Sequence, residues 1–334
     1  LADYSAFILG GLPKQGQMLE EVKDLLLNEI KKLRAGEFDE KMLQANINNF
    51  KLYELQSMES NEGRADIFVN SFINGTNWED EVTAIDRMAK LTKEDIVAFA
   101  DKYLKEDNYA VVYKKQGKDP NEKKMTKPEI TPIVSNRDVA SPFLTSIQEN
   151  AVKPIEPVFL DFKKDMSQLT AKSDIPVLYK QNTTNDLFQL IYVFDMGNNN
   201  DKALGTAFDY LEYLGTSDMT PEELKSEFYR LACTFYVSPG NERTYVVLSG
   251  LNENMPAAMQ LFEKLLADAQ VNKEAYDNLV GDILKARADA KLNQGQNFSR
   301  LMNYAMYGPK SPATNLLTEA ELASMNPQEL VDRI

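Results

Sequence analysis

The chain has 334 residues and a formal net charge of −14, with 51 aspartates and glutamates against 37 lysines and arginines. This acidic excess argues against nucleic acid and anionic membranes as partners, because the surface would repel phosphate groups. The chain has no histidine and a single cysteine, Cys233, so it lacks the residues for an imidazole-based zinc site, for Ser-His or Cys-His catalysis, and for a disulfide.

At this length the chain should divide into two domains or parts of domains. It opens with Leu1-Ala2-Asp3-Tyr4, without an initiator methionine, and no segment has the length of a membrane span or the pattern of a signal peptide. We therefore expect a piece cut from inside a longer protein, with no membrane insertion. Cys233 lies in an apolar run and is expected to be a buried thiol, not a nucleophile.

The first third of the chain combines apolar runs with amphipathic stretches. Leu19 to Leu33 carries apolar residues at helical spacing with Gly36 as a stop, and Thr92 with Asp95 forms a capping box for a later helix. Apolar, β-favouring runs open and close the region. The predicted order is a strand at 5–12, helices at 19–33, 39–55, 65–72, 78–91 and 96–104, and a strand at 109–113.

The middle of the chain is rich in proline. Residues 117–165 contain prolines at 120, 128, 132, 142, 154 and 157 and show no sustained period, which predicts an extended linker. Beyond it, Thr220 with Pro221 indicates the start of a helix. The predicted elements are strands at 176–181, 187–194 and 245–250, and helices at 255–267, 273–291 and 298–306.

The end of the chain repeats the element order of its beginning. Gly11 and Gly250 lie 239 positions apart and Asp95 and Glu329 lie 234 apart, a drift that a few loop residues would absorb. A repeat of this length has the period of a domain. It predicts an α+β protein with two related domains, each an antiparallel sheet backed by helices, in which 1–117 is the back half of one copy, 118–165 a linker and 166–334 most of a second copy.

The stretch from Asp209 to Thr216, D-Y-L-E-Y-L-G-T, has the frame of the inverted zinc motif H-x-x-E-H on a predicted helix. In that motif two histidines four residues apart bind zinc and the glutamate activates a water. Asp209 and Tyr213 stand at the histidine positions, and only Glu212 keeps its place. The frame therefore predicts a degenerate site that holds no zinc. The same residues would also suit an ordinary buried helix face.

The octet with its trailing Gly215-Thr216, together with the domain-sized repeat, resembles the pitrilysin/insulinase family of zinc metallopeptidases over essentially the whole chain. The resemblance implies two lobes of paired α/β domains around a chamber, with zinc in the first domain only. It also implies that the family's third zinc ligand, a glutamate on a long downstream helix, and a second glutamate seven residues earlier correspond here to Asp289 and Asp282. In the first copy, Asn48 corresponds to Asp282 and Leu55 corresponds to Asp289.

Four carboxylates could still offer oxygen ligands to calcium or magnesium: Asp209, Glu212, Asp282 and Asp289. Such ions usually need more oxygen ligands and a loop that wraps them. A solvated acidic cluster left on a decayed site is the interpretation that we favour.

Two arginine and tyrosine pairs are the other candidates for a contact with substrate. Arg243 lies beside Tyr245, and Arg300 is near Tyr304. Residues of these types could bind a peptide backbone, but at such spacings they also occur as packing and surface residues.

The resemblance implies a non-catalytic portion of a zinc-dependent metalloendopeptidase that acts on peptides or unfolded polypeptides. Residues 1–117 would end the second domain, 118–165 would connect the lobes, and 166–334 would form most of the third, inactive domain. Zinc is expected upstream in the parent chain, and no cofactor is expected in this segment. A catalytically inactive scaffold or partner subunit of the same fold is the alternative function.

The expected partners are a peptide substrate and the remaining domains of the same chain. The isolated segment is also expected to self-associate through an exposed sheet edge. The resemblance suggests a bacterial protein of the periplasm or a secreted one, with the cytoplasm as the alternative.

Overall fold

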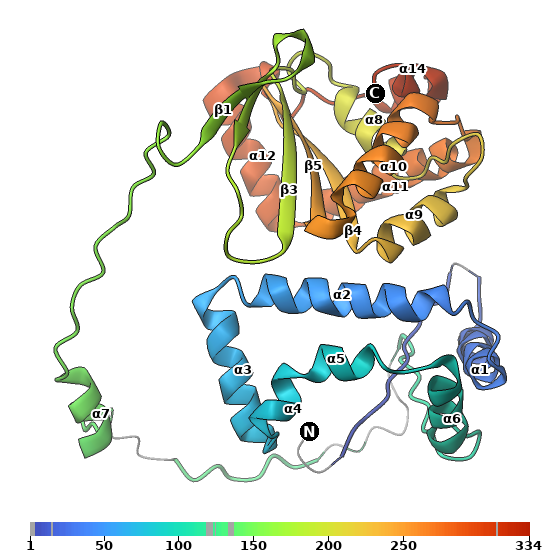
Figure 1. Ribbon diagram of the computed structural model, residues 1–334. Helices are drawn as coiled ribbons and strands as arrows, with labels where there is room; N and C mark the ends of the chain where they lie inside the picture. The colour runs from blue at the N-terminus through green and yellow to red at the C-terminus, as the bar shows by residue number, and fades with distance from the viewer. Residues whose placement is uncertain (1–3, 15, 118–122, 124, 133–136, 312) are drawn as a thin grey trace. The chain divides into compact units, whose positions relative to one another are not determined.

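The computed structural model describes residues 4–14, 16–117, 123, 125–132, 137–311 and 313–334. The chain divides into two compact units, one made of Leu1–Asn108 with Asn182–Ile334 and the other of Tyr109–Gln181. Helices and two small antiparallel sheets make up the described elements (Figure 1). The predicted α+β class is confirmed. No helix in the described part of the chain combines the length and apolar character needed to cross a bilayer.

The first region is helical as predicted, although the helix predicted at 78–91 is two short helices and those predicted to start at 65 and 96 start at Asn61 and Lys93. Gly36 ends the first helix in a left-handed conformation, as predicted. Thr92 and Asp95 form the predicted capping box. The helices are α1 (Leu19–Ala35), α2 (Lys41–Ser57), α3 (Asn61–Asn74), α4 (Trp78–Val82), α5 (Ala84–Met88) and α6 (Lys93–Tyr103).

The strands predicted at 5–12 and 109–113 are wrong, and the described residues of 4–117 contain no strand. Both segments are apolar, yet Leu12 and Val112 are each 93% exposed. A strand needs a neighbour to bind its backbone N–H and C=O groups. Neither segment has one in the described part of the chain, so β-favouring composition alone does not produce a strand.

The unit Tyr109–Gln181 contains α7 (Pro142–Gln148) within the range predicted as an extended linker. Ser141 caps this helix by accepting a hydrogen bond from the Leu144 amide. The sequence analysis counted Pro142 as a linker proline and therefore missed this helix start. The strands β1 (Ser167–Thr170) and β2 (Pro176–Tyr179) form a two-stranded antiparallel sheet, with η1 (Lys172–Asp174) between them. Thus β2 pairs with β1 and not with the strand predicted at 187–194.

The last region contains a three-stranded antiparallel sheet in the order β3-β5-β4. The central strand β5 carries the buried side chains of Val246 and Leu248, which pack with Phe228 and Phe262 from two covering helices. The strand β4, which the sequence analysis missed, contributes Phe235 to this cluster. The elements are β3 (Leu187–Phe194), α8 (Leu204–Leu211), α9 (Pro221–Arg230), β4 (Cys233–Pro239), β5 (Thr244–Leu251) and α10 (Met255–Asp268).

The helices that follow β5 keep the order seen in the first region. They are α10, α11 (Lys273–Leu292), α12 (Gln294–Tyr307), α13 (Glu319–Ser324) and α14 (Pro327–Val331), with the short η2 (Asn252–Asn254) and η3 (Gly308–Lys310) between them. Helices α1, α2, α3 and α6 begin at 19, 41, 61 and 93, and α10, α11, α12 and α14 begin at 255, 273, 294 and 327, so their starts differ by 232–236 positions. The helices therefore recur in register, while the sheet occurs only beside the second series in the described chain.

A buried tyrosine joins the helix of the motif to the long helix α11. Tyr210 on α8 is 0% exposed. Its hydroxyl donates to the carbonyl of Asn272 at 2.7 Å and accepts from the Asn272 amide at 2.9 Å. Asn272 is also the cap of α11, because its side chain accepts from the Ala275 amide. The ring of Tyr210 meets Tyr276 edge to face, with 5.8 Å between ring centroids.

We expect Tyr210→Phe to lower the free energy of unfolding by about 1 kcal/mol, because it removes the buried hydroxyl that is hydrogen-bonded to the amide and the carbonyl of Asn272. Tyr213→Phe is the matched control: it removes the same atom three residues away, from a side chain that is 43% exposed, and should change stability little. Urea denaturation of both variants measures the difference. Equal stability of the two variants would contradict the role given to Tyr210.

Candidate functional site

Of the octet predicted as one helix, only the first three residues, Asp209 to Leu211, are helical. Helix α8 ends at Leu211, and the next residues form a tight turn in which the Tyr213 amide donates to the Tyr210 carbonyl at 2.9 Å. The chain then passes close to itself at Gly215, where a Cβ atom would lie 2.3 Å from the carbonyl oxygen of Met219. The prediction of a helix through Thr216 is therefore wrong beyond Leu211. Tyr213 lies after the helix and does not share a helical face with Asp209.

The residues at the motif do not fit a zinc ion. Asp209 and Glu212 are exposed carboxylates, and no described group of three or more His, Cys, Asp or Glu side chains could hold a metal. Neighbouring atoms remove part of the water around Asp209, and the nearby Glu212 adds a like charge. Both effects raise the pKa of the Asp209 carboxyl. The sequence had given no reason to expect a raised carboxyl pKa here.

The two downstream aspartates take separate roles on α11. Asp289 accepts from Lys285 at 2.7 Å in an ion pair along the helix. Asp282 lines a cavity of about 270 Å³ together with Tyr213. Lys225 lines the same cavity, with its ammonium 5.6 Å from the centroid of the Tyr213 ring. Lys225 adds a positive charge to the cavity that Asp282 lines, which makes it a poor site for calcium or magnesium.

The corresponding position in the first copy has a structural contact. Asn48, on α2, donates from its side-chain amide to the carbonyl of Arg230 at 3.1 Å, and Asn49 donates to the carbonyl of Tyr229 at 2.7 Å. These carbonyls belong to the last residues of α9, whose carbonyl groups have no partner within the helix. At this position the first copy therefore has an asparagine that joins α2 to the end of α9.

Cys233 behaves as the sequence predicted. It is buried at the start of β4, and burial raises the pKa of its thiol to about 11. The thiol is therefore protonated at neutral pH and is no nucleophile.

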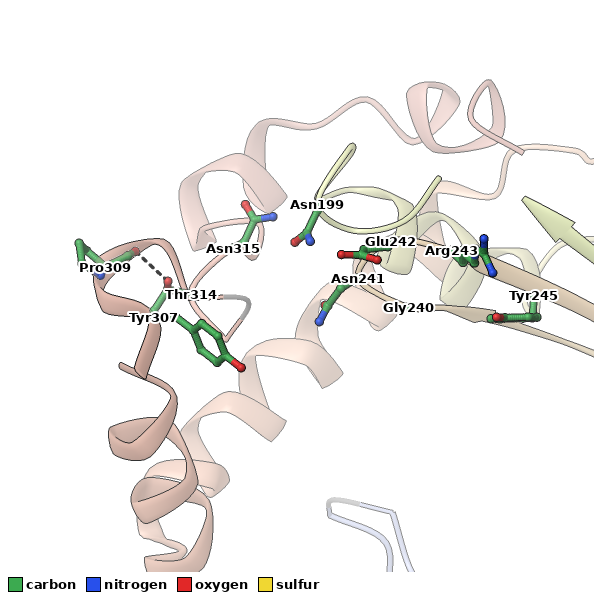
Figure 2. Close-up of a pocket in the computed structure, with 10 residues that line it drawn as sticks. All are labelled: Asn199, Gly240, Asn241, Glu242, Arg243, Tyr245, Tyr307, Pro309, Thr314 and Asn315. Carbon is green, nitrogen blue, oxygen red and sulfur yellow. Dashed lines mark hydrogen bonds between the residues drawn. The ribbon is translucent and has the colours of Figure 1, made fainter. Parts of the chain in front are cut away.

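A larger cavity, of about 1070 Å³, lies where the β4–β5 turn meets two other segments (Figure 2). The turn Gly240–Arg243 supplies one side, Asn199 comes from the loop before α8, and the segment after α12 supplies the rest. The lining residues are Asn199, Gly240, Asn241, Glu242, Arg243, Tyr245, Tyr307, Pro309, Thr314 and Asn315. We name it the turn cavity.

One asparagine holds the three segments of the turn cavity together. The Asn198 amide donates to the Gly240 carbonyl at 2.9 Å, and its side chain donates to the Pro239 carbonyl at 3.0 Å. Its side-chain oxygen accepts from the amide of Gly205 at the start of α8. Its carbonyl accepts from the side chain of Asn315 at 2.9 Å. The walls of the cavity are therefore fixed by direct hydrogen bonds.

The sequence analysis identified only some of the residues that line the turn cavity. It singled out Arg243 and Tyr245, and the structure places both at the cavity. Arg300 and Tyr304 lie on α12 and are not among the residues that line it. The sequence analysis missed the asparagines and Glu242, although the run of asparagines at 198–200 indicates a turn. Such a run predicts a loop, and only the fold shows what the loop faces.

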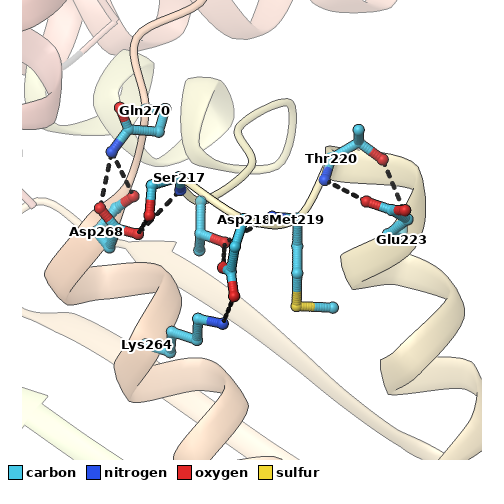
Figure 3. Close-up of polar contacts among 9 residues, drawn as sticks. Ser217, Asp218, Met219, Thr220, Glu223, Lys264, Asp268 and Gln270 are labelled. Atoms are coloured by element: carbon cyan, nitrogen blue, oxygen red, sulfur yellow. Dashed lines mark hydrogen bonds and ion pairs between the residues drawn. The ribbon is translucent and has the colours of Figure 1, made fainter.

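The loop that follows the motif is fixed by charged contacts (Figure 3). Asp218 accepts from Lys264 on α10 at 2.6 Å and from the Thr216 hydroxyl at 2.8 Å. Asp268 accepts from the amide and the hydroxyl of Ser217. The contacts with Lys264 and Thr216 lower the pKa of the Asp218 carboxyl, and those with Ser217 lower that of Asp268. These residues position the Gly215-Thr216 turn and leave no acid or base free for catalysis.

We expect the stabilising coupling between Asp218 and Lys264 to depend on pH. Because the pKa of Asp218 is lower in the folded chain than its usual 3.8, its contribution is complete above that value and is lost as the pH falls through the folded pKa. A double-mutant cycle with Asp218→Asn and Lys264→Gln, measured by urea denaturation, should give a favourable coupling at pH 7 that vanishes in acid. A coupling that persists at the lowest pH would contradict the assigned ion pair.

No family model matches the chain, and no curated protein does. Among solved structures the chain is similar to the inactive domain of a peptidase M16 protein from Pseudomonas fluorescens, with 15% identity, a TM-score of 0.44 and coverage of 51% of this chain and 42% of that one. It is similar to the periplasmic protease PqqL from Escherichia coli, with 14% identity, a TM-score of 0.44 and coverage of 94% and 37%.

A third similar structure is the ferredoxin protease FusC, solved in complex with Arabidopsis ferredoxin, with 10% identity, a TM-score of 0.44 and coverage of 91% of this chain and 37% of that one. The chain thus spans 37–42% of the length of these structures. One of these three structures is a peptidase M16 inactive domain and the other two are proteases.

Proposed function

We propose that this chain is a non-catalytic portion of a zinc-dependent metalloendopeptidase, with the zinc and the catalytic glutamate in another part of a longer protein. The observation that carries the proposal is the motif frame. Asp209, at the end of α8, and Tyr213, in the turn after it, stand at both histidine positions in a chain that has no histidine, and Gly215-Thr216 follows them. A framework kept without its ligands suits a domain retained for its shape.

Within such an enzyme the chain would form part of the wall of an enclosed chamber and hold the substrate peptide. Residues 1–117 would end the second domain, 118–165 would connect the lobes, and 166–334 would form most of the third domain. The strand β3 supports peptide binding, because in the described chain it pairs only with β5. Its other edge offers backbone groups that an extended peptide can bind. We place the protein in the periplasm or outside a bacterial cell, with the cytoplasm as the alternative.

The test is the activity of the complete protein that contains this chain. Hydrolysis of quenched fluorescent peptides that stops on addition of a zinc chelator and returns with zinc supports the proposal. A complete protein that hydrolyses no peptide under these conditions would instead favour the inactive scaffold or partner subunit.

We expect the 334-residue chain to bind no stoichiometric zinc, because it offers no imidazole and its single thiol is buried. Metal analysis after dialysis against micromolar zinc measures this. One zinc per chain that is lost in Glu212→Gln or Asp289→Asn would show that these carboxylates form a real site. Zinc retained equally by both variants would point to adventitious surface binding.

We expect Glu212→Gln in the complete protein to leave kcat/KM for peptide hydrolysis within a few-fold of the wild type, because Glu212 has no metal-bound water to activate. The matched control is the same change at the glutamate of an intact H-x-x-E-H motif elsewhere in that protein, which should abolish activity. Loss of activity in Glu212→Gln, with thermal stability unchanged, would mean that this domain takes part in the chemistry.

A further inference from the structure

The turn cavity contains several polar groups that no protein group satisfies. Among the described side chains, those of Asn199, Asn241 and Glu242 make no hydrogen bond or ion pair. The ring of Tyr307, 60% exposed, projects from the end of α12 (Figure 2). Side-chain amides can each donate and accept, as a peptide group does. The walls therefore present free groups of the kind that bind a peptide main chain.

Of the two charged residues that line the turn cavity, Glu242 and Arg243, only the arginine has a described ion-pair partner. Arg243 donates to Asp195 at 2.9 Å, so this pair contributes no net charge. Glu242 has no partner among the described residues, and in Figure 2 its carboxylate points toward the side that carries Asn199 and Asn315. Of the two charged residues in the described lining, Glu242 is therefore the one without an ion-pair partner.

We propose that the turn cavity binds a peptide through a basic side chain, with Glu242 as the counterion of an arginine or lysine and Tyr307 as the aromatic surface beside it. A carboxylate and an aromatic face are the two groups that recognise a guanidinium or ammonium ion. The side-chain amides of Asn199 and Asn241 are placed to bind the adjoining peptide groups. The proposal rests on the proposed function in taking a peptide as the ligand.

Size and charge favour this ligand over a neutral or acidic one. A volume of about 1070 Å³ is at the upper end of the roughly 300–1,000 Å³ of ligand pockets, which suits several residues of a peptide and exceeds the needs of a single ion. The net charge of −14 attracts cations to the whole surface and raises their association rate. A neutral sugar, which polar and aromatic walls could also accept, would leave Glu242 uncompensated.

The experiment compares two terminally blocked five-residue peptides that differ at the central position, one with arginine and one with citrulline, its neutral isostere. Isothermal titration calorimetry measures their binding to the 334-residue chain at low ionic strength. We expect the arginine peptide to bind about tenfold more tightly, as for a hydrogen bond between charged groups. In Glu242→Gln this preference should disappear while the affinity for the citrulline peptide stays the same.

Glu274→Gln is the matched control, since it removes the same charge from an exposed glutamate that does not line the cavity, and it should keep the arginine preference. Tyr307→Ala should weaken both peptides, because it removes a surface that each can contact. Equal binding of the two peptides, no binding of either, or a preference that survives in Glu242→Gln would overturn the proposal.

These outcomes are separate from those that test the proposed function. A chain that shows the arginine preference but belongs to a complete protein without peptidase activity would support peptide binding at the turn cavity and contradict the proposed enzyme. Zinc-dependent hydrolysis by the complete protein, with no arginine preference in the chain, would support the proposed enzyme and contradict peptide binding at the turn cavity.

Discussion

The position of Asn198 is the constraint on which the polar side of the last region depends. Its side chain and backbone bind the β4–β5 turn, the start of α8 and the loop at Asn315 at once. The contact leaves no room beside it, because a Cβ atom on Gly197 would lie 2.5 Å from the carbonyl oxygen of Gly240. The same hydrogen bonds therefore fix both the start of α8 and the shape of the turn cavity. The degenerate motif and the cavity share one framework.

The framework and the chemistry of the motif have separated in this chain. Tyr210 still joins α8 to α11 through Asn272, and Gly215 still allows the turn that follows. These contacts depend on packing and backbone geometry, which the loss of metal ligands does not disturb. At the ligand positions themselves, Asp209 and Tyr213 are exposed. Substitution there leaves no buried charge, and the fold tolerates it at little cost.

The sequence predicted helices better than strands for a physical reason. A helix satisfies its backbone within the segment, so the capping box at Thr92 and the Thr220-Pro221 pair indicated the caps of their helices correctly. A strand depends on a distant partner. The run at 5–12 has no partner in the described chain, while β4 at Cys233–Pro239 gains one in β5. The turn cavity was less predictable still, because three segments far apart in the sequence form it.

The two helical series show how one position takes different roles. Asn48 on α2 corresponds to Asp282 on α11, and their helices begin 232 positions apart. Asn48 donates to the end of α9 at Arg230, a contact that requires a donor and excludes a carboxylate. Asp282 lines a small cavity together with Lys225. Each residue type follows from the local partner and not from an inherited ligand role. A position that recurs in the two helical series is thus free to differ between them, provided that each residue suits its neighbours.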